Sequence, residues 1–204
     1  MVITIGREFG SGGRELGKRL ADELGVLYYD KEIIKEIATA SNLNEQYVES
    51  VIEKGLPGRF IYTFGQTFTH MPVIAENSMV NVLSEQRKVL NRLAEKDCVI
   101  VGRSADVILE GVDHFRIFIY ADEQSKIKRC RERAPEGERL TDKQLIKKMK
   151  AVDYGRKKLH SVLSHLPWGD KRGYDLMINT SNTDISKIVP LVAEYIRHFY
   201  NKKI

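Results

Sequence analysis

The sequence predicts an α/β fold, built as a doubly wound, mostly parallel five-stranded sheet with two insertions. Three observations support this fold class. Five short apolar segments alternate with segments of helical periodicity, which indicates strands connected by helices. Two of them, 98–101 and 115–120, are nearly continuous apolar runs, typical of strands covered on both faces of a parallel sheet. A glycine cluster follows the first strand and opens a helix, at the end of the sheet where ligands bind in such folds.

The strand candidates are short and lie along the whole chain. MVITI begins at the first residue and is apolar enough to be a central strand. The runs VLYYD and DLMIN supply two further strands. In chain order, the five strand candidates are 1–5, 26–30, 98–101, 115–120 and 175–179.

Helix signals follow the strands. Leucines recur at four-residue intervals in a predicted helix over 14–25, and Gly25 is placed to end it. Asp30 is placed to cap the next helix, whose apolar face consists of isoleucines. The last helix contains Pro190, which we expect to kink it or to confine its start.

Two insertions would flank the ligand crevice. Residues 41–94 read as mostly helical, interrupted by a stretch rich in glycine, proline and aromatic residues. The aromatic segment 59–70 fits base stacking or an acceptor pocket, although packing or a homo-oligomer interface is favoured. Residues 128–173 are strongly basic and contain a capping box, Thr141 with Gln144, that begins a helix.

Length and composition predict one ordinary globular domain spanning 1–204. The chain is 42% hydrophobic and 30% charged, with a formal net charge of +5. Its basic residues are interleaved with acidic ones, which favours a small anionic ligand over nucleic acid. Cys98 and Cys130 have no framework spacing, so we expect free thiols and a cytoplasmic protein. No apolar stretch reaches the ~20 residues of a membrane span, so no membrane partner is expected.

The stretch GREFGSGGRE, residues 6–15, has the features of an anion site. Its glycines permit positive φ and a close backbone approach, so that successive N–H groups can point into one concavity. The helix that begins near Arg14 adds the positive end of its dipole. Alternatively, the glycines only make a tight turn, but their place after the first strand favours phosphate binding. We expect a P-loop-like cradle for nucleotide phosphates made by Gly10, Ser11, Gly12, Gly13 and Arg14.

This loop lacks the lysine of the P-loop pattern. Aligned on its strand, Arg7 falls at the first glycine, Gly13 at the lysine, and Glu15 near the residue that holds Mg²⁺. Arg7 and Arg14 are therefore the candidates to bring positive charge to the phosphates, as a planar fork in place of a point charge. Glu15 is kept among the cofactor-binding residues as a metal ligand, although an ion pair with Arg19 is slightly favoured.

Several segments together resemble a known family. GREFGSGGREL, YYDKEI, VGRSAD and WGDKRGYDLMINTS are similar to the cytidylate-kinase-like branch of the nucleoside monophosphate kinases, over nearly the whole chain. The resemblance implies a P-loop kinase core, an acceptor-binding insertion over 41–94 and an arginine-bearing lid within 128–173. It also implies that Arg103 grips the acceptor phosphate. The family's next residue is an aspartate, for which Ser104 stands here, with Asp106 as a stand-in.

The lid region offers positive charge to a transferring phosphoryl group, which such a transfer requires. The spacing from Arg129 to Arg133 allows about two of these three alternating arginines to reach the site. Asp153 lies one helical turn before Arg156, and either orients it or forms a plain surface ion pair. The lid residues expected at the substrates are Arg131, Arg133, Asp153, Arg156 and Lys157.

Together these features predict a P-loop phosphotransferase. It would use ATP and Mg²⁺, whose ligands the sequence does not identify, to phosphorylate a small phosphorylated acceptor, with a nucleoside monophosphate such as CMP as first choice. Asp30 either contacts that acceptor or only caps its helix. Three alternatives stay open: a non-catalytic nucleotide sensor, a kinase of a non-nucleotide molecule, and a scaffold with an emptied site. No histidine or cysteine cluster has metal-ligand spacing.

Overall fold

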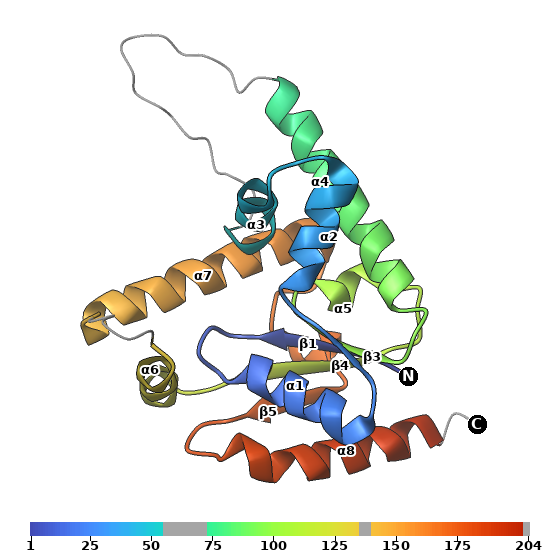
Figure 1. The fold of residues 1–204 in the computed structure, drawn as a ribbon. Helices are drawn as coiled ribbons and strands as arrows, with labels where there is room; N and C mark the ends of the chain where they lie inside the picture. Colours follow the sequence, from blue (N-terminus) through green and yellow to red (C-terminus); the bar gives the residue numbers. More distant parts are fainter. Residues whose placement is uncertain (55–72, 135–139, 202–204) are drawn as a thin grey trace.

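The computed structural model describes residues 1–54, 73–134 and 140–201 (Figure 1). The aromatic segment 59–70 lies outside the described residues, so its expected roles stay predictions.

The described strands form one five-stranded sheet in which every pair is parallel. The order is β2-β3-β1-β4-β5, with β1 (Val2–Arg7) in the centre. Its neighbours are β3 (Cys98–Val101) and β4 (Phe115–Tyr120), and Arg7 lies opposite Ile119 of β4. The edges are β2 (Leu27–Tyr29) and β5 (Leu176–Asn179). The predicted α/β fold with a five-stranded sheet is confirmed, and the sheet is wholly parallel.

Helices connect the strands and cover both faces of the sheet (Figure 1). They are α1 (Gly13–Leu24), α2 (Glu32–Ser41), α3 (Glu45–Lys54), α4 (Val73–Leu93), α5 (Ala105–Ile108), α6 (Glu123–Glu132), α7 (Asp142–Leu163), the short 3₁₀ helix η1 (Lys171–Gly173) and α8 (Ile185–Asn201).

Alternate strand residues point into two separate apolar cores. In β3, Val99 and Val101 face the core shared with α1 and α8, whereas Cys98 and Ile100 face the core shared with α2, α4 and α5. A third, smaller cluster joins α6 to α7 and includes Phe9 of the glycine loop. The loop is therefore packed against the helices that lie over it.

The ends of several helices agree with their sequence signals. Gly25 follows α1 in the left-handed conformation, with φ of 69°, and the capping box of Thr141 with Gln144 begins α7. Pro190 lies inside α8. The cap predicted for Asp30 is wrong: Lys31 precedes α2, and no side chain caps that helix. The Asp30 carboxylate pairs with Arg14 instead.

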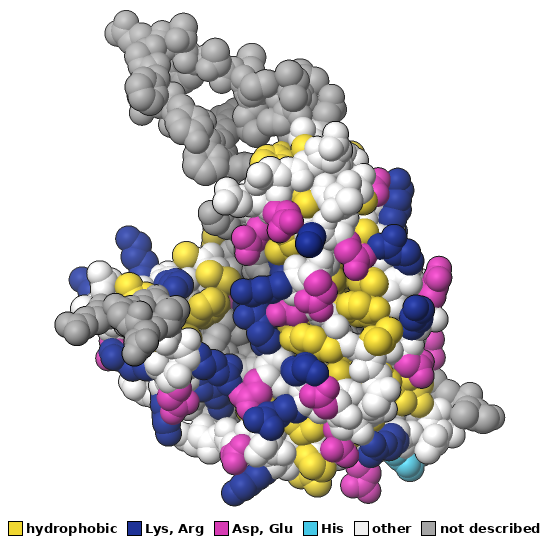
Figure 2. Space-filling model, in the orientation of Figure 1, with side chains coloured by type: hydrophobic (Ala, Val, Ile, Leu, Met, Phe, Trp, Pro, Cys, Tyr) yellow, Lys and Arg dark blue, Asp and Glu magenta, His cyan; other side chains and the backbone are white. Residues whose placement is uncertain are grey.

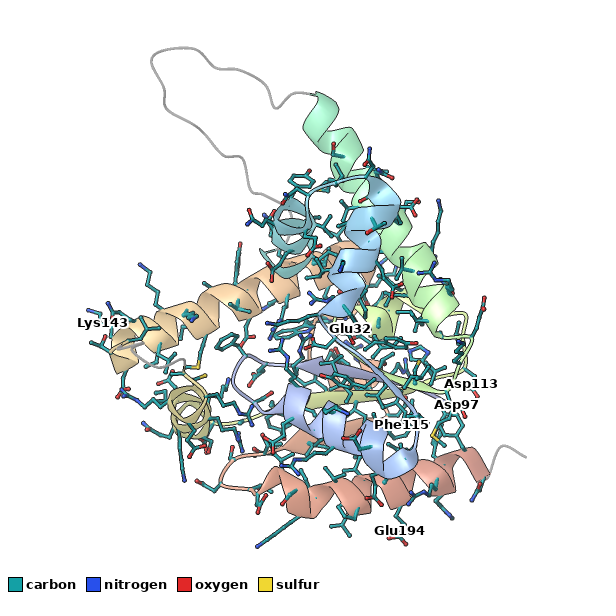
Figure 3. All side chains as sticks on the ribbon, in the orientation of Figure 1. Glu32, Asp97, Asp113, Phe115, Lys143 and Glu194 are labelled. Carbon is teal, nitrogen blue, oxygen red and sulfur yellow. The ribbon has the colours of Figure 1, made fainter. Side chains whose placement is uncertain are left out.

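The sheet presents its carboxyl ends to α6 and α7. Asp97 and Asp113, which precede β3 and β4, lie at the opposite end of these strands, where the strands begin (Figure 3). Lys143 marks the outer end of α7, and Glu32 begins α2 close to the sheet. Ligand sites of parallel sheets lie at the carboxyl ends of the strands, so a ligand is expected beside the glycine loop.

Candidate functional site

A cavity of about 760 Å³ lies between the glycine loop and helices α6 and α7. We call it the donor cavity. Lys and Arg side chains gather at the hollow between the lobe formed by α6 and α7 and the body of the molecule (Figure 2). Among the described residues, Glu8 is the one acidic residue of the lining, and the basic ones are Arg7, Arg14, Lys31, Arg129, Arg131, Arg133, Lys148 and Arg156. Such a lining suits a polyanion.

The glycine loop supplies backbone donors to this cavity. Gly10 and Gly12 have φ of 77° and 84°, conformations that glycine adopts without strain. Gly12 precedes α1 and no side chain caps that helix, so the N–H groups of its first turn remain available for an anion. Gly10, Gly12 and Gly13 line the cavity, as the sequence suggested.

The loop is held in place from two sides. On one side, Thr180, which follows β5, donates its hydroxyl to the Ser11 carbonyl at 2.7 Å. On the other side, Asp153 of α7 accepts a hydrogen bond from the Phe9 N–H at 2.7 Å. Arg156 donates to the Arg7 carbonyl at 3.1 Å and to Asp153 at 3.2 Å. These bonds preorganise the cradle, which lowers the cost of ordering it around a ligand.

The pair Asp153–Arg156 is therefore not a plain surface ion pair. Their side chains are 19% and 14% exposed, and both bond the backbone of the glycine loop. Burial raises the pKa of Asp153, and the neighbouring Arg156 guanidinium opposes this rise without cancelling it.

Arg7 is buried between two glycines. Only 7% of the residue is exposed, and its Nη2 atom lies 3.9 Å from the Asp30 Oδ1 atom. Arg14 approaches the same carboxylate more closely, at 2.5 Å from Nε to Oδ2. Asp30 is 4% exposed and holds both arginines that were expected at the phosphates. A buried carboxylate between two guanidinium groups orients them.

Beyond β3, a tight turn places a second buried arginine. Gly102, Arg103 and Ser104 have φ of 77°, 61° and 48°, so three consecutive residues are left-handed. Arg103 is 5% exposed, and its carbonyl accepts a hydrogen bond from the Gln86 amide at 2.5 Å. This conformation keeps the side chain of Arg103 in the interior.

Arg103 lines a second cavity of about 30 Å³, which we call the acceptor cavity. It shares Arg7 and Arg156 with the donor cavity. Asp106, the expected stand-in for the family's aspartate, also lines it, together with Trp168. The two cavities therefore share two arginine residues.

The sequence analysis did not identify a buried polar group behind the acceptor cavity. His160 of α7 is 4% exposed, and its Nε2 atom lies 3.5 Å from Asp106 Oδ2. The same Asp106 also acts on Tyr174, whose pKa is raised first by burial and then by the Asp106 charge. His160 lies seven residues after Asp153 and four after Arg156, which places all three on one face of α7. That spacing could have identified it.

All three alternating arginines of α6 line the donor cavity, rather than two of them. The reason is that α6 ends at Glu132, so Arg133 leaves the helical spacing on which the prediction depended. Arg129 donates to Thr180 and Thr183, and burial lowers its pKa. Arg131 pairs with Asp142, and Arg133 pairs with Glu15.

Five predicted site residues line neither cavity: Ser11, Glu15, Asp30, Asp153 and Lys157. Asp30 and Asp153 instead bond groups that line the donor cavity. Glu15 pairs with Arg19 at 2.9 Å, as favoured, and lies outside the donor-cavity lining. Ser11 is fully buried and lies outside the donor-cavity lining; its hydroxyl donates to the Glu8 carbonyl at 2.8 Å, and its own carbonyl accepts from Thr180. Lys157 is exposed and lines neither cavity, because neighbouring residues of a helix face different directions.

Other residues of the site carried no usable signal in the sequence. Thr180 is fully buried and anchors the loop, yet it reads as an ordinary residue after a strand. Gln86 is fully buried and holds the turn at Arg103 across a long sequence separation. Lys31 and Lys148 line the donor cavity from α2 and α7. Their convergence depends on tertiary packing.

Two structural absences concern the described residues. In that part of the chain, no group of three or more His, Cys, Asp or Glu side chains is arranged to hold a metal ion. None of the helices that it contains combines the length and apolar character that a membrane span requires.

The five-stranded parallel sheet, with flanking helices and a glycine loop after its central strand, is the fold of P-loop kinases. The chain belongs to the cytidylate kinase-like family, whose model matches residues 2–182. Among curated proteins, none matches the sequence.

Solved structures similar to the chain have the same fold. An uncharacterized protein from Eubacterium ventriosum ATCC 27560 is 27% identical, with a TM-score of 0.69 over 97% of this chain and 98% of that chain. Shikimate kinase from Bacteroides thetaiotaomicron is 16% identical, with a TM-score of 0.57 over 97% and 98% of the two chains. Shikimate kinase from Acinetobacter baumannii, in complex with shikimate, is 14% identical, with a TM-score of 0.51 over 97% and 92%.

Proposed function

We propose that this protein transfers the γ-phosphoryl group of ATP to a small phosphorylated acceptor, with a nucleoside monophosphate such as CMP as the first candidate. The single observation that carries the proposal is the meeting of the donor and acceptor cavities at Arg7 and Arg156. Phosphoryl transfer depends on positioning and on positive charge around the transferring group. Two guanidinium groups at the boundary supply both. Membership of the cytidylate kinase-like family supports the reaction class.

The donor cavity fits a nucleoside triphosphate. Backbone N–H groups at Gly10, Gly12 and Gly13 would receive the phosphates, and the first turn of α1 favours negative charge. Arg14 reaches the same cavity and would exchange its contact with Asp30 for a phosphate oxygen. Arg131 and Arg133 would close over the polyphosphate from α6.

Mg²⁺ would be held mainly by the nucleotide. Magnesium in kinases keeps several water ligands and uses phosphates with one or two carboxylates. Glu8 is the carboxylate in the donor-cavity lining, and Lys126 binds it at 2.6 Å. Glu15, near the usual hydroxyl position, is engaged by Arg19 and Arg133. The metal, when bound, would neutralise charge that develops on the phosphates.

The acceptor would bind on the side of Arg103. Arg7, Arg103 and Arg156 line that cavity, so an anionic group on the acceptor would meet three guanidinium groups. Asp30 would orient Arg7 from beneath rather than bind the acceptor directly, because its carboxylate lies in neither lining.

A non-nucleotide acceptor is the second candidate. The acceptor cavity of about 30 Å³ has room for about one water molecule, far less than a nucleobase requires. The shikimate kinases that share the fold act, by name, on a small carboxylate-bearing molecule rather than a nucleotide. An anionic acceptor of that size would suit the same arginines.

A coupled assay of ATP consumption tests the proposal across both acceptor classes. The panel contains the nucleoside monophosphates and small hydroxylated carboxylates such as shikimate, each with ATP and Mg²⁺. We expect turnover with one class. ATP binding by calorimetry without turnover on any acceptor would favour the sensor alternative. Absence of both binding and turnover would reject the nucleotide site altogether.

A further inference from the structure

The side chain of Arg7 and the missing side chain of Gly13 occupy one space. A methyl group built on Gly13 would lie 2.6 Å from Cβ of Arg7 and 3.0 Å from its Cγ. Real carbon atoms do not approach so closely, so any side chain at position 13 conflicts with the first carbon atoms of Arg7. Position 13 is where a P-loop carries its lysine, and position 7 is where it carries its first glycine.

The far end of Arg7 passes through the space of a second glycine. A methyl group on Gly102 would lie 1.5 Å from Nη1 of Arg7 and 2.5 Å from its Cζ. Gly102 belongs to the turn that positions Arg103, and it lines the acceptor cavity. The arginine therefore runs from the phosphate loop, past Gly13, to the acceptor side.

We propose that Arg7 and Gly13 are a matched exchange, in which the cation of the phosphate loop has moved from position 13 to position 7. This inference rests on the proposed function and identifies its phosphate-binding cation as Arg7 rather than Arg14. Arg14 is 53% exposed at its side chain and begins beyond the loop, whereas Arg7 is buried at the boundary of both cavities. Asp30 fixes the direction of the guanidinium.

If the exchange is correct, placing the usual P-loop lysine at position 13 should weaken the site rather than improve it. Restoring lysine with Gly13→Lys alone should damage the site, because the new side chain meets Arg7. Combining it with Arg7→Gly restores the usual P-loop pattern at both positions and removes the conflict. The paired variant should therefore bind phosphate better than either single variant.

A thermal-unfolding cycle tests the exchange without requiring nucleotide binding. Gly13 has an ordinary negative φ at the start of α1, where alanine is better than glycine. We expect Gly13→Ala to lower the Tm by at least about 3 °C in the wild type and to leave it unchanged or raised with Arg7→Gly. Arg7→Ala keeps Cβ, so with it Gly13→Ala should still lower the Tm. Equal losses in the wild-type and Arg7→Gly backgrounds would overturn the exchange.

Gly17 supplies a matched control in the same helix. A methyl group on Gly17 would lie 2.6 Å from Cγ2 of Val101, which is independent of Arg7. Gly17→Ala should therefore lower the Tm equally in the wild type and with Arg7→Gly. A loss that depended on Arg7 would show that the cycle reports a general effect of Arg7 on the helix and would overturn the inference.

Calorimetry with ATP and with inorganic tripolyphosphate then tests the cation itself. Gly13→Lys and Arg7→Gly should each weaken binding about tenfold or more, and their combination should recover most of the loss. A paired variant that binds no better than the singles would overturn the assignment of the cation. If neither probe binds the wild type while the unfolding cycle succeeds, the proposed function and the role of Arg7 as its cation fail, and the steric exchange alone stands.

Discussion

Arg14 and Asp30 form a close ion pair at 2.5 Å, although the sequence predicted separate tasks for them. The carboxylate also faces the buried Arg7, at 3.9 Å. In the absence of phosphate, the Asp30 carboxylate therefore offsets the repulsion between the guanidinium groups of Arg7 and Arg14.

Asp30→Asn should make the fold more dependent on a phosphate ligand. Without the carboxylate, the protein should lose about 1–3 kcal/mol of unfolding free energy in the absence of phosphate, because Arg7 and Arg14 lose a buried acidic partner. Tripolyphosphate should then raise the Tm of Asp30→Asn more than that of the wild type. The comparison is thermal unfolding with and without tripolyphosphate.

Asp22→Asn is the control for that comparison. It removes a carboxylate that pairs with Lys18 on an exposed face of α1, where such pairs contribute little. Its tripolyphosphate shift should match the wild type. If tripolyphosphate raised the Tm equally in Asp30→Asn, Asp22→Asn and the wild type, Asp30 would not be the group that offsets the repulsion between the arginines.

Arg156→Lys should reduce phosphoryl transfer more than donor binding. Lysine keeps the charge but cannot bond the Arg7 carbonyl and Asp153 in the same geometry while facing both cavities. We expect kcat to fall at least about tenfold with a smaller change in the KM for ATP. Steady-state kinetics on the acceptor found by the panel supply both values. Lys157→Ala, one residue away and exposed, should leave both values unchanged.

Nucleotide should protect one cysteine from alkylation. Cys130 lines the donor cavity, and a methyl group on Gly10 would lie 3.0 Å from its sulfur. Cys98 is fully buried, and burial raises the pKa of its thiol to about 11, so it should react slowly. Mass spectrometry after iodoacetamide should show modification of Cys130 that ATP slows. In the Cys130→Ser variant, this ATP-sensitive labelling should be absent. Labelling of Cys130 that ATP does not slow would argue against a nucleotide in this cavity.

Asp153→Asn should change how stability depends on pH. Burial raises the pKa of Asp153 above its ordinary value of 3.8, so the folded protein binds the proton more tightly than the unfolded chain. Asp153 therefore lowers stability as the pH rises from 3.8 through its folded-state pKa. In Asp153→Asn this decline is absent, so stability should rise more steeply with pH in that window. Urea unfolding at several pH values measures the slopes, and identical slopes would contradict the burial of this charge.

The two strands that flank β1 were predictable because they are largely buried on both faces. Cys98–Val101 and Phe115–Tyr120 match their predicted bounds, since an apolar run in a parallel sheet needs no alternation to be recognised. The glycine loop and its following helix were equally legible, because glycine in a tight turn and the periodicity of α1 are local properties.

The errors arose where tertiary charge overrode local preference. A helix cap contributes about 1 kcal/mol to stability. Burying the charge of Arg7 without an acidic neighbour costs more, so Asp30 faces Arg7 instead of capping α2. The end of α6 at Glu132 brought Arg133 to the donor cavity, and helix bounds are hard to read from sequence. Thr180 and Gln86 act only through partners far away in the chain.

A crystal structure with a non-hydrolysable ATP analogue would show whether the glycine loop holds phosphate. We expect the phosphates to lie against the backbone N–H groups of Gly10, Gly12 and Gly13, with the Arg7 guanidinium facing them. An analogue bound elsewhere, or a glycine loop that stays closed by its own side chains at saturating analogue, would contradict it.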